Sequence, residues 1–370
     1  MRDVRFCARC VMPNTRPRIV FDALGVCNGC RFAEEKSRID WTARRRDFEA
    51  LIEAGRGRGT YDCIVPWSGG KDSSTIAHRL KAEFGLNPLL VTFSPLIPNA
   101  IGARNREAFL NLGFDSIMIR PNQKASRRLA RRFLEERGNP KVHWDAGVNA
   151  APVRSAVEQR VPLVLYAEHG ESEYGGRVLS EDHRRMRDLT EVLEHQIGDD
   201  PANWTDEVIG PRDLAPYLYP AAEDVACVGV KALYFGWFFR WSMAENWQYI
   251  QGVMPFATAP NGRTDGTFTN FDSLDDAIDD LYYHLQYIKF GFGRATRDAC
   301  RMVQNGELTR AEALEKVRAY DDEFPSTHLA EALDYLGLDE AGLARILDTH
   351  RNDEIWVFEG NRWRLRHPPR

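Results

Sequence analysis

The chain has 370 residues, of which 43% are hydrophobic, and its net charge is -5. Its length supports one large domain with a smaller one, or two to three compact units. The negative net charge argues against a protein whose whole surface binds the phosphate backbone of a nucleic acid. No apolar run approaches the ~20 residues that span a bilayer. Because the N-terminal stretch also has no apolar signal-peptide core, we expect a soluble, cytoplasmic protein.

Two Cys-x-x-Cys pairs stand near the N-terminus, Cys7 with Cys10 and Cys27 with Cys30. Pairs at this separation are typical of a tetrahedral zinc site with four thiolate ligands. The stretch RIVFDALGVC between them predicts a short strand and turn, as in a zinc ribbon. Four thiolates leave no open position on the metal, so we predict a structural zinc; the alternative is redox-active or unpaired cysteines.

The other three of the seven cysteines are Cys63, Cys227 and Cys300. Each lies in an apolar or helical stretch, which favours a small core residue over a nucleophile. The stretch EAGRGRGT (53–60) is the best candidate for a linker. We predict three regions: a zinc ribbon (1–40), an ATP-binding α/β domain (41–255) and a helical C-terminal region (256–370).

A strand, a glycine-rich turn and a helix follow the predicted linker. The run YDCIVPW (61–67) predicts a buried strand, SSTIAHRLKAEF a helix, and NPLLVTF a second strand, which together make a parallel βαβ unit. The turn itself reads SGGKDS (68–73). Its glycines allow the backbone to approach a phosphate closely, and the N–H groups at the start of the helix favour an anion.

Two charged residues give this turn its chemistry. Lys71 is a point charge for phosphate, and Asp72 could hold Mg²⁺ beside a pyrophosphate. The pattern fits neither a Walker A loop nor a G-x-G-x-x-G turn. The alternative is an ordinary glycine-rich connection between a strand and a helix.

Three further strands are predicted, FDSIMI (114–119), VPLVLYAEHG (161–170) and VKALYFGW (230–237). Helical stretches separate them, which favours an open parallel sheet in the order 3-2-1-4-5. In such sheets ligands bind at the carboxyl ends of the strands, beside the switch point between strands 1 and 4. The turn would therefore meet Glu168 and Glu171, which could hold Mg²⁺ or orient ammonia; the alternative is a polar loop with solvated carboxylates.

The C-terminal region is predicted to be helical. A helix over 273–292 would begin at Ser273 as its N-cap, and shorter helices are predicted over 294–304, 309–320, 327–336 and 339–350. Earlier in the chain, one helical stretch carries Arg127, Arg128, Arg131 and Arg132. We interpret these arginines as a solvated helix face, with contact to a nucleotide-sugar diphosphate or an acidic partner as the alternative.

The turn resembles the SGGxDS signature of the PP-loop ATP pyrophosphatases, which split ATP between its α- and β-phosphates. Further strings are similar to one group of that superfamily, the N-acetyl sugar amidotransferases of bacterial surface-polysaccharide (O-antigen-type lipopolysaccharide) pathways. The matching strings are CxxCVMPNTRP, FDALGVCNGC, IVPWSGGKDSS, LGFDSIMIRPN, EYGG, GWFFRW, GTFTNFDS and YIKFGFGRATRDAC. They extend from residue 7 to about residue 300.

The resemblance implies a PP-loop (HUP-like) fold that uses ATP, Mg²⁺ and a structural Zn²⁺. The catalytic residues we expect are Lys71, Asp72, Glu168 and Glu171. The nucleotide contacts we expect are Ser68, Gly69, Gly70, Lys71, Asp72, Ser73, Ser74, Thr92 and Gly170. The metal ligands we expect are Cys7, Cys10, Cys27 and Cys30.

The resemblance also implies a reaction. The carbonyl oxygen of an N-acetyl sugar, nucleotide-linked in this expectation, attacks the α-phosphorus of ATP, and ammonia then displaces AMP, which turns an acetamido into an acetamidino group. No cysteine outside the zinc pairs stands in a recognisable nucleophile context. We therefore expect ammonia from separate glutaminase and cyclase-like subunits, similar to those of imidazole glycerol phosphate synthase.

Two other functions remain open on sequence alone. A PP-loop sulfurtransferase, such as a tRNA thiolase, would use the same adenylation with a persulfide in place of ammonia. It would need a reactive cysteine near the ATP site and a basic surface for tRNA. The second alternative is a zinc-ribbon scaffold that binds a nucleotide without turnover, against which the intact Lys71, Asp72 and Ser73 argue.

Overall fold

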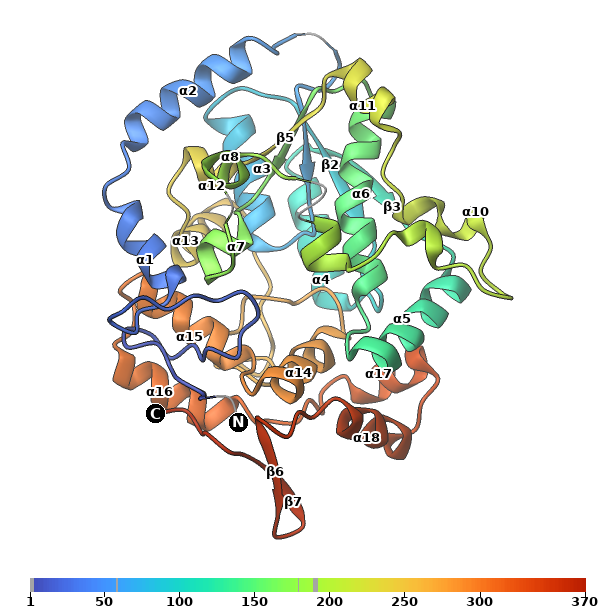
Figure 1. Ribbon diagram of the computed structural model, residues 1–370. Coiled ribbons are helices and arrows are strands. Elements are labelled where there is room, and N and C mark those ends of the chain that lie inside the picture. The colour runs from blue at the N-terminus through green and yellow to red at the C-terminus, as the bar shows by residue number, and fades with distance from the viewer. Residues whose placement is uncertain (1–2, 58, 179, 189–191) are drawn as a thin grey trace.

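A five-stranded parallel sheet forms the centre of the computed structural model, which describes residues 3–57, 59–178, 180–188 and 192–370 (Figure 1). Its strands are β1 (Cys63–Pro66), β2 (Pro88–Phe93), β3 (Asp115–Ile119), β4 (Leu163–Tyr166) and β5 (Lys231–Tyr234). Their order is β3-β2-β1-β4-β5, and every neighbouring pair is parallel, which confirms the predicted fold class.

All five strands are shorter than the predicted runs, and β4 and β5 end three or more residues early. β4 ends at Tyr166, and three residues later His169 caps the short helix α7 (Gly170–Tyr174). β5 passes directly into another short helix, α12 (Phe235–Phe238). The apolar stretches that predicted longer strands therefore continue as helical turns at the carboxyl edge of the sheet.

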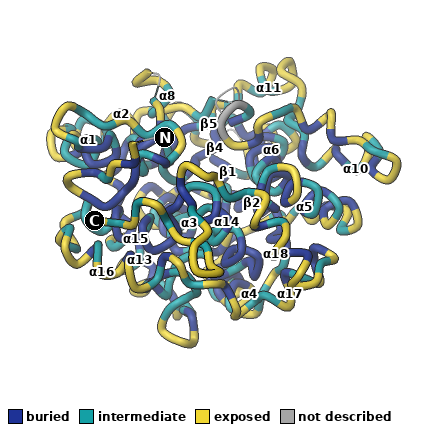
Figure 2. Tube along the Cα trace, turned by 60° about the horizontal axis from the view of Figure 1, so that its bottom comes forward, coloured by how far each residue is buried: buried dark blue, intermediate teal, exposed yellow. Residues whose placement is uncertain are grey.

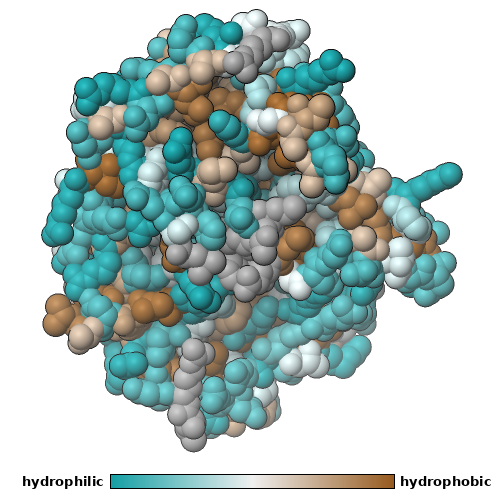
Figure 3. Space-filling model, turned by 45° about the horizontal axis from the view of Figure 1, so that its top comes forward, coloured by the Kyte–Doolittle hydropathy of each residue, from teal (hydrophilic) through white to brown (hydrophobic). Residues whose placement is uncertain are grey.

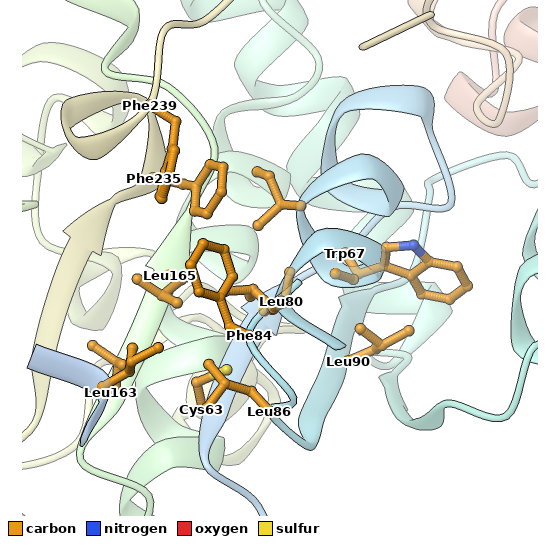
Figure 4. Close-up of a cluster of buried hydrophobic side chains, with 14 of the residues drawn as sticks. Cys63, Trp67, Leu80, Phe84, Leu86, Leu90, Leu163, Leu165, Phe235 and Phe239 are labelled. Atoms are coloured by element: carbon orange, nitrogen blue, oxygen red, sulfur yellow. The ribbon is translucent and has the colours of Figure 1, made fainter. Parts of the chain in front are cut away.

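Helices cover both faces of the sheet. Alternate residues of a strand point to opposite faces, and here both sets are apolar, so both faces must be buried. Cys63 and Val65 pack on one side, against α2 (Trp41–Glu53), α3 (Lys71–Ala82), α4 (Ala100–Leu110), α12 and α13 (Met243–Val253). Ile64 packs on the other side, against α5 (Gln123–Arg137) and α6 (Val142–Glu158). Figure 4 shows the first of these clusters, and Figure 2 shows buried residues concentrated around the strands.

The N-terminal segment has little regular structure before α1 (Asn28–Lys36). Two isolated antiparallel pairs hold it, Phe6 with Pro13 and Phe21 with Cys27. The strand predicted between the cysteine pairs is reduced to the second of these pairings. The predicted linker 53–60 begins where α2 ends, and its residue 58 lies outside the described residues.

Short helices fill the connections around β4 and β5. Besides α7 and α12, these are α8 (Glu181–Arg185), a π-helix (Leu193–Ile197), two 3-10 helices (Pro201–Asn203 and Ala215–Tyr217), α10 (Pro211–Leu214) and α11 (Ala222–Val228). The prediction that Cys227 is a core residue is wrong. α11 buries none of its residues, and Cys227 is exposed on it, whereas Cys63 and Cys300 are buried as predicted.

The C-terminal region begins with a non-helical stretch (256–278), is helical from Asp279 to Thr349 and then ends in a hairpin that was not predicted. Its elements are α14 (Asp279–Phe290), α15 (Arg294–Gln304), α16 (Arg310–Tyr320), α17 (Leu329–Leu336), α18 (Glu340–Thr349), β6 (Trp356–Glu359) and β7 (Arg362–Leu365). β6 and β7 pair antiparallel, and Asn361 between them takes a positive φ of 62°.

The predicted start of α14 is wrong, because Ser273 does not cap it. The Asp276 carboxylate accepts the backbone N–H groups of Leu96 at 3.0 Å and Ile97 at 2.9 Å. This pairing holds the residues before α14 as an extended segment against the 96–98 stretch, so the helix begins only at Asp279. Ser273 lies in the preceding loop, where its hydroxyl is 2.9 Å from that of Tyr283.

Among the described residues, no helix combines the length and the apolar content needed to cross a membrane. The face of the molecule turned forward in Figure 3 is largely hydrophilic, with hydrophobic side chains gathered in small patches.

Candidate active site

The turn 68–73 joins β1 to α3 at the carboxyl edge of the sheet. Gly69 takes a positive φ of 88°, and a Cβ on it would lie 2.3 Å from Cγ of Arg106, so a side chain at this position is excluded. Ser68 Oγ accepts the backbone N–H of Gly70 at 3.1 Å. Gly70 occupies the N-cap of α3 and offers no side-chain cap, which leaves the first N–H groups of a 12-residue helix available to an anion.

Lys71 is held between two carboxylates. Its side chain is 1% exposed, and Nζ donates to Asp72 Oδ2 at 2.8 Å and to Asp272 Oδ1 at 2.9 Å. Burial opposes the charged ammonium, but the charges of Asp272 and Asp72 outweigh it and raise the pKa of Lys71 above its ordinary value. A buried, charged lysine therefore stands at the start of α3.

Asp272 was not among the predicted site residues, although it lies in the quoted string GTFTNFDS. Besides Lys71, its side chain faces Arg301 at 3.6 Å, and its backbone carbonyl accepts from Arg294 at 2.6 Å. Burial opposes its ionised form, but the charges of Lys71, Arg301 and Arg294 lower the pKa of Asp272 below its ordinary value. That string was the only sequence signal for it, because no local pattern links residue 272 to residue 71.

Asp72 is oriented from the opposite side by α13. Asn246 Nδ2 donates to Asp72 Oδ1 at 2.9 Å, while Lys71 occupies Oδ2. Thus both carboxylates that flank Lys71 have fixed positions, and carboxylate oxygens are ligands of the kind that Mg²⁺ prefers.

A cavity of about 400 Å³ opens at the turn, and we call it the turn cavity. Its walls are the 68–73 turn, the facing residues of α4 and the start of α6, the 271–276 loop, and residues of α14 and α15. Six carboxylates contribute to these walls: Asp72, Asp145, Asp272, Asp275, Asp276 and Asp279. Within the described part of the chain, only three cationic residues do so: Lys71, Lys141 and Arg297.

The acidic side of the turn cavity is only partly compensated. Lys141 is buried and pairs with Asp276 at 3.3 Å and with Asp279. Burial raises the pKa of Asp145 to about 7, against the charge of Lys141. Burial and the charges of Asp279 and Asp276 also raise the pKa of Asp275 to about 7. Such a surplus of carboxylates fits a divalent cation that arrives with a phosphate ligand.

Carboxylates alone do not form a closed metal site in this cavity. Across residues 3–57, 59–178, 180–188 and 192–370, the four N-terminal cysteines are the only group of potential ligands that converges within 4.8 Å. Mg²⁺ usually takes one or two carboxylates together with substrate phosphates and water. Asp72 and Asp272 are therefore the residues that would hold it.

We expect Asp145→Asn to raise the melting temperature more at about pH 8 than at about pH 5. In the unfolded chain Asp145 ionises near its ordinary pKa of 3.8, whereas in the folded protein its pKa is about 7. Its ionisation thus costs folding free energy that accumulates from about pH 4 to about pH 7 and stays constant above, on the order of a few kcal/mol. Thermal unfolding across this range measures the effect.

The matched control for this prediction is Asp353→Asn, which removes an exposed carboxylate. Its melting temperature should follow that of the wild type at every pH. If the melting temperature of the Asp145→Asn variant exceeded that of the wild type by the same amount at pH 5 and pH 8, a raised pKa of Asp145 would be contradicted as the cause.

Five of the predicted site residues do not line the turn cavity: Ser74, Thr92, Glu168, Gly170 and Glu171. Ser74 Oγ accepts from Trp67 Nε1 at 2.8 Å, and Thr92 Oγ1 donates to the Trp67 carbonyl at 2.5 Å. These two side chains orient the residue that precedes the turn. Gly170 begins α7.

The two predicted glutamates have different surroundings. Glu168 Oε1 accepts from the Tyr174 hydroxyl at 2.5 Å, and burial together with the charge of Asp72 raises the pKa of Glu168. The charge of Asp72 in the turn thus acts on Glu168. Glu171 is instead held by Arg18 of the N-terminal segment at 2.7 Å and 3.0 Å, so the structure does not bring it to the cavity.

The arginine-rich face of α5 is paired within the protein. Arg127 contacts Asp334, Arg128 contacts Asp206 and Glu207, Arg131 contacts Glu135, and Arg132 contacts Glu136. None of the four lines the turn cavity. Their intramolecular partners account for them without a bound nucleotide.

Cys7, Cys10, Cys27 and Cys30 are all buried, and their sulfurs lie within 4.8 Å of one another. Cys7 Sγ is 3.9 Å from Cys30 Sγ, and Cys10 Sγ is 3.8 Å from Cys27 Sγ. A tetrahedral zinc with Zn–S bonds of about 2.3 Å separates its sulfurs by about 3.8 Å. The four thiols thus have the arrangement of a closed structural zinc site, as predicted.

α15 connects this cysteine cluster to the turn cavity. Cys300 and Ala299 on α15 pack in the same buried cluster as the four cysteines, and Gln304 Nε2 lies 3.9 Å from Cys30 Sγ. The other side of α15 carries Arg294 and Arg301, which contact Asp272. The cysteine cluster therefore supports the helix that positions the partner of Lys71.

Residues 265–367 match a family model described as "LPS biosynthesis protein WbpG-like, C-terminal domain". The matched segment includes Asp272 and all of α14 and α15. No match was found among curated proteins. A crystal structure described as a predicted subunit of a tRNA methyltransferase from Methanocaldococcus jannaschii is 17% identical, over 45% of this chain and 74% of its own, with a TM-score of 0.23. A likeness this weak supports no argument about the fold or function of this chain.

Proposed function

We propose that this protein is an ATP-dependent amidotransferase of lipopolysaccharide biosynthesis. In this proposal it adenylates the carbonyl oxygen of an N-acetyl sugar and replaces that oxygen with ammonia. The observation that carries the proposal is Lys71, a buried ammonium between Asp72 and Asp272 at the uncapped start of α3. The family model that covers Asp272 supports the lipopolysaccharide setting.

The phosphates of ATP are assigned to the 68–73 turn. The backbone N–H groups at the start of α3 and the Ser68 and Ser73 hydroxyls would bind them, and Lys71, held by Asp72 and Asp272, would place its positive charge beside them. Mg²⁺, held by Asp72 and Asp272, would neutralise charge on the phosphates. Lys71 would stabilise the additional charge that develops on pyrophosphate as it leaves.

The proposed reaction has two steps, a substitution at the α-phosphorus of ATP and a substitution at the carbonyl carbon of the acetamido group. The N-acetyl carbonyl oxygen forms a bond to the α-phosphorus while the bond from that phosphorus to the β-phosphate oxygen breaks, which releases pyrophosphate. Ammonia then adds to the imidate carbon and loses a proton, and the carbon–oxygen bond breaks to release AMP. The original carbonyl oxygen leaves on AMP, and the sugar carries an acetamidino group.

Glu168 is the residue we assign to the ammonia step. Its raised pKa and its charge interaction with Asp72 suit a group that takes up or orients a proton. Glu171, paired with Arg18, is assigned to holding the N-terminal segment rather than to the chemistry. Ammonia would come from separate glutaminase and cyclase-like subunits.

We expect the purified protein to form AMP and an amidine from one member of a panel of nucleotide-linked and free N-acetyl sugars. The incubation contains ATP, Mg²⁺ and ammonium, and mass spectrometry follows the sugar while chromatography follows AMP. AMP and amidine should appear in equal amounts. If instead only tRNA with a sulfur donor yields AMP and a thiolated nucleotide, the protein is a sulfurtransferase and the proposal is wrong.

A further inference from the structure

A second cavity of about 440 Å³ lies between the N-terminal segment, the start of α6, α14 and α15, and we call it the ribbon cavity. It shares Tyr282 and Arg297 with the turn cavity, so the two are adjacent. Six cationic residues contribute to its walls: Arg16, Arg18, Arg137, Lys289, Arg297 and Arg301. None of its described wall residues is acidic.

Three of these cations are already neutralised by carboxylates. Arg18 pairs with Glu171 at 2.7 Å, and Arg137 pairs with Asp199 at 2.7 Å. Arg301 lies 3.6 Å from Asp272. These three stabilise the walls of the cavity but leave little charge for a ligand.

The other three have no carboxylate partner within the described part of the chain. Arg16 donates only to backbone carbonyls, including that of Gly175 at 2.8 Å, and Lys289 donates only to the Arg137 carbonyl at 2.6 Å. Burial lowers the pKa of Arg16 to about 10, with Glu171 opposing this shift and Arg297 adding to it. Burial and Arg137 also lower the pKa of Lys289. Such desolvated, unpaired cations favour a bound anion.

Arg297 stands where the two cavities meet. Its guanidinium has no hydrogen bond or ion pair to the residues that the structure describes, and it lies 4.8 Å from the centre of the Tyr283 ring. Five N–H donors are therefore available at the boundary between an acidic and a basic cavity. The acidic cavity suits phosphates that arrive with Mg²⁺, whereas the basic cavity suits phosphates that arrive without it.

We propose that the ribbon cavity binds the phosphate groups of the acceptor sugar, with Arg297, Arg16 and Lys289 as the binding residues. This assignment rests on the proposed function, since it places the second substrate beside the ATP turn. Arg297 would hold the acceptor at the boundary, so that its N-acetyl group enters the turn cavity. Tyr174, Phe290 and Phe292 supply aromatic surface for the remainder of the acceptor.

The test is direct binding by calorimetry, which does not require turnover. The probes are uridine diphosphate N-acetylglucosamine, N-acetylglucosamine 1-phosphate and free N-acetylglucosamine, each in the presence of saturating α,β-methylene-ATP and Mg²⁺. We expect the first probe, or the first two, to bind, and the free sugar to bind far more weakly. Which phosphorylated probe binds more tightly distinguishes a nucleotide-linked acceptor from a sugar phosphate.

Arg297→Gln should weaken binding of the phosphorylated probe by about 10- to 100-fold and leave the affinity for α,β-methylene-ATP unchanged. Lys289→Gln serves as the second variant if the first is unstable. The matched control is Arg127→Gln, which changes an arginine on α5 outside both cavities and should have no effect.

The inference is overturned if the ATP analogue displaces the phosphorylated probe, or if Arg297→Gln and Lys289→Gln both bind it as well as the wild type. Failure of the proposed function has a different signature. In that case the probe binds in an Arg297-dependent manner, but no sugar of the activity panel yields an amidine.

Discussion

Lys71→Ala is expected to lower ATP-dependent pyrophosphate release by about 10²–10³-fold, the usual cost of removing one group that stabilises developing negative charge. Lys71 is the buried cation at the start of α3, and Asp72 and Asp272 hold it in place. Without it, the two carboxylates would face each other and repel the phosphates of ATP. Single-turnover measurement of pyrophosphate separates this loss from slow product release.

Two further variants make this prediction specific. Lys124→Ala removes an exposed lysine on α5 and should leave the rate unchanged. Asp272→Asn removes the negative charge that faces the Lys71 ammonium and Arg301, so it should also slow pyrophosphate release, by a smaller factor. A folded Lys71→Ala protein with an undiminished rate would exclude Lys71 from the chemistry.

Cys27→Ser is expected to abolish zinc binding and lower the melting temperature by about 10 °C or more, since a structural zinc contributes its binding free energy to folding. Activity should fall with it. The four cysteines pack against Ala299 and Cys300 of α15, and the same helix carries Arg294 and Arg301 to Asp272. Loss of a zinc ion from this cluster would therefore loosen the helix that positions the partner of Lys71.

Metal content, melting temperature and activity are measured on the same samples. Cys227→Ser, which changes an exposed cysteine on α11, is the matched control and should bind as much zinc as the wild type. A structural zinc site would be contradicted if neither the wild type nor Cys227→Ser contained zinc. It would also be contradicted if Cys27→Ser had the melting temperature of the wild type.

The sheet could be predicted because its signals are local. Each strand is an apolar run followed by a helical stretch, and the right-handed crossover rule then limits the possible strand orders. The glycine-rich turn and the two cysteine pairs are likewise short motifs, and such motifs indicate a type of ligand even when the fold is unknown. The predicted groups at 68–73 and at Cys7, Cys10, Cys27 and Cys30 each come together in space.

The features that could not be predicted depend on distant contacts. Asp272 becomes the partner of Lys71 only through the packing of the C-terminal region on the sheet. α14 begins after Ser273 because Asp276 pairs with the backbone near Leu96, and a helix-capping pattern carries no information about that pairing. The ribbon cavity likewise combines residues from the N-terminal segment, α6, α14 and α15, none of which forms a motif alone.

The transfer of the carbonyl oxygen to AMP is the most direct test of the proposed reaction. An acceptor labelled with oxygen-18 in its N-acetyl carbonyl would be incubated with the protein, ATP, Mg²⁺ and ammonium, and the products analysed by mass spectrometry. We expect the label in the phosphate of AMP and none in pyrophosphate or in the amidine product. Unlabelled AMP, with the label retained on the sugar, would contradict adenylation of the acetamido oxygen.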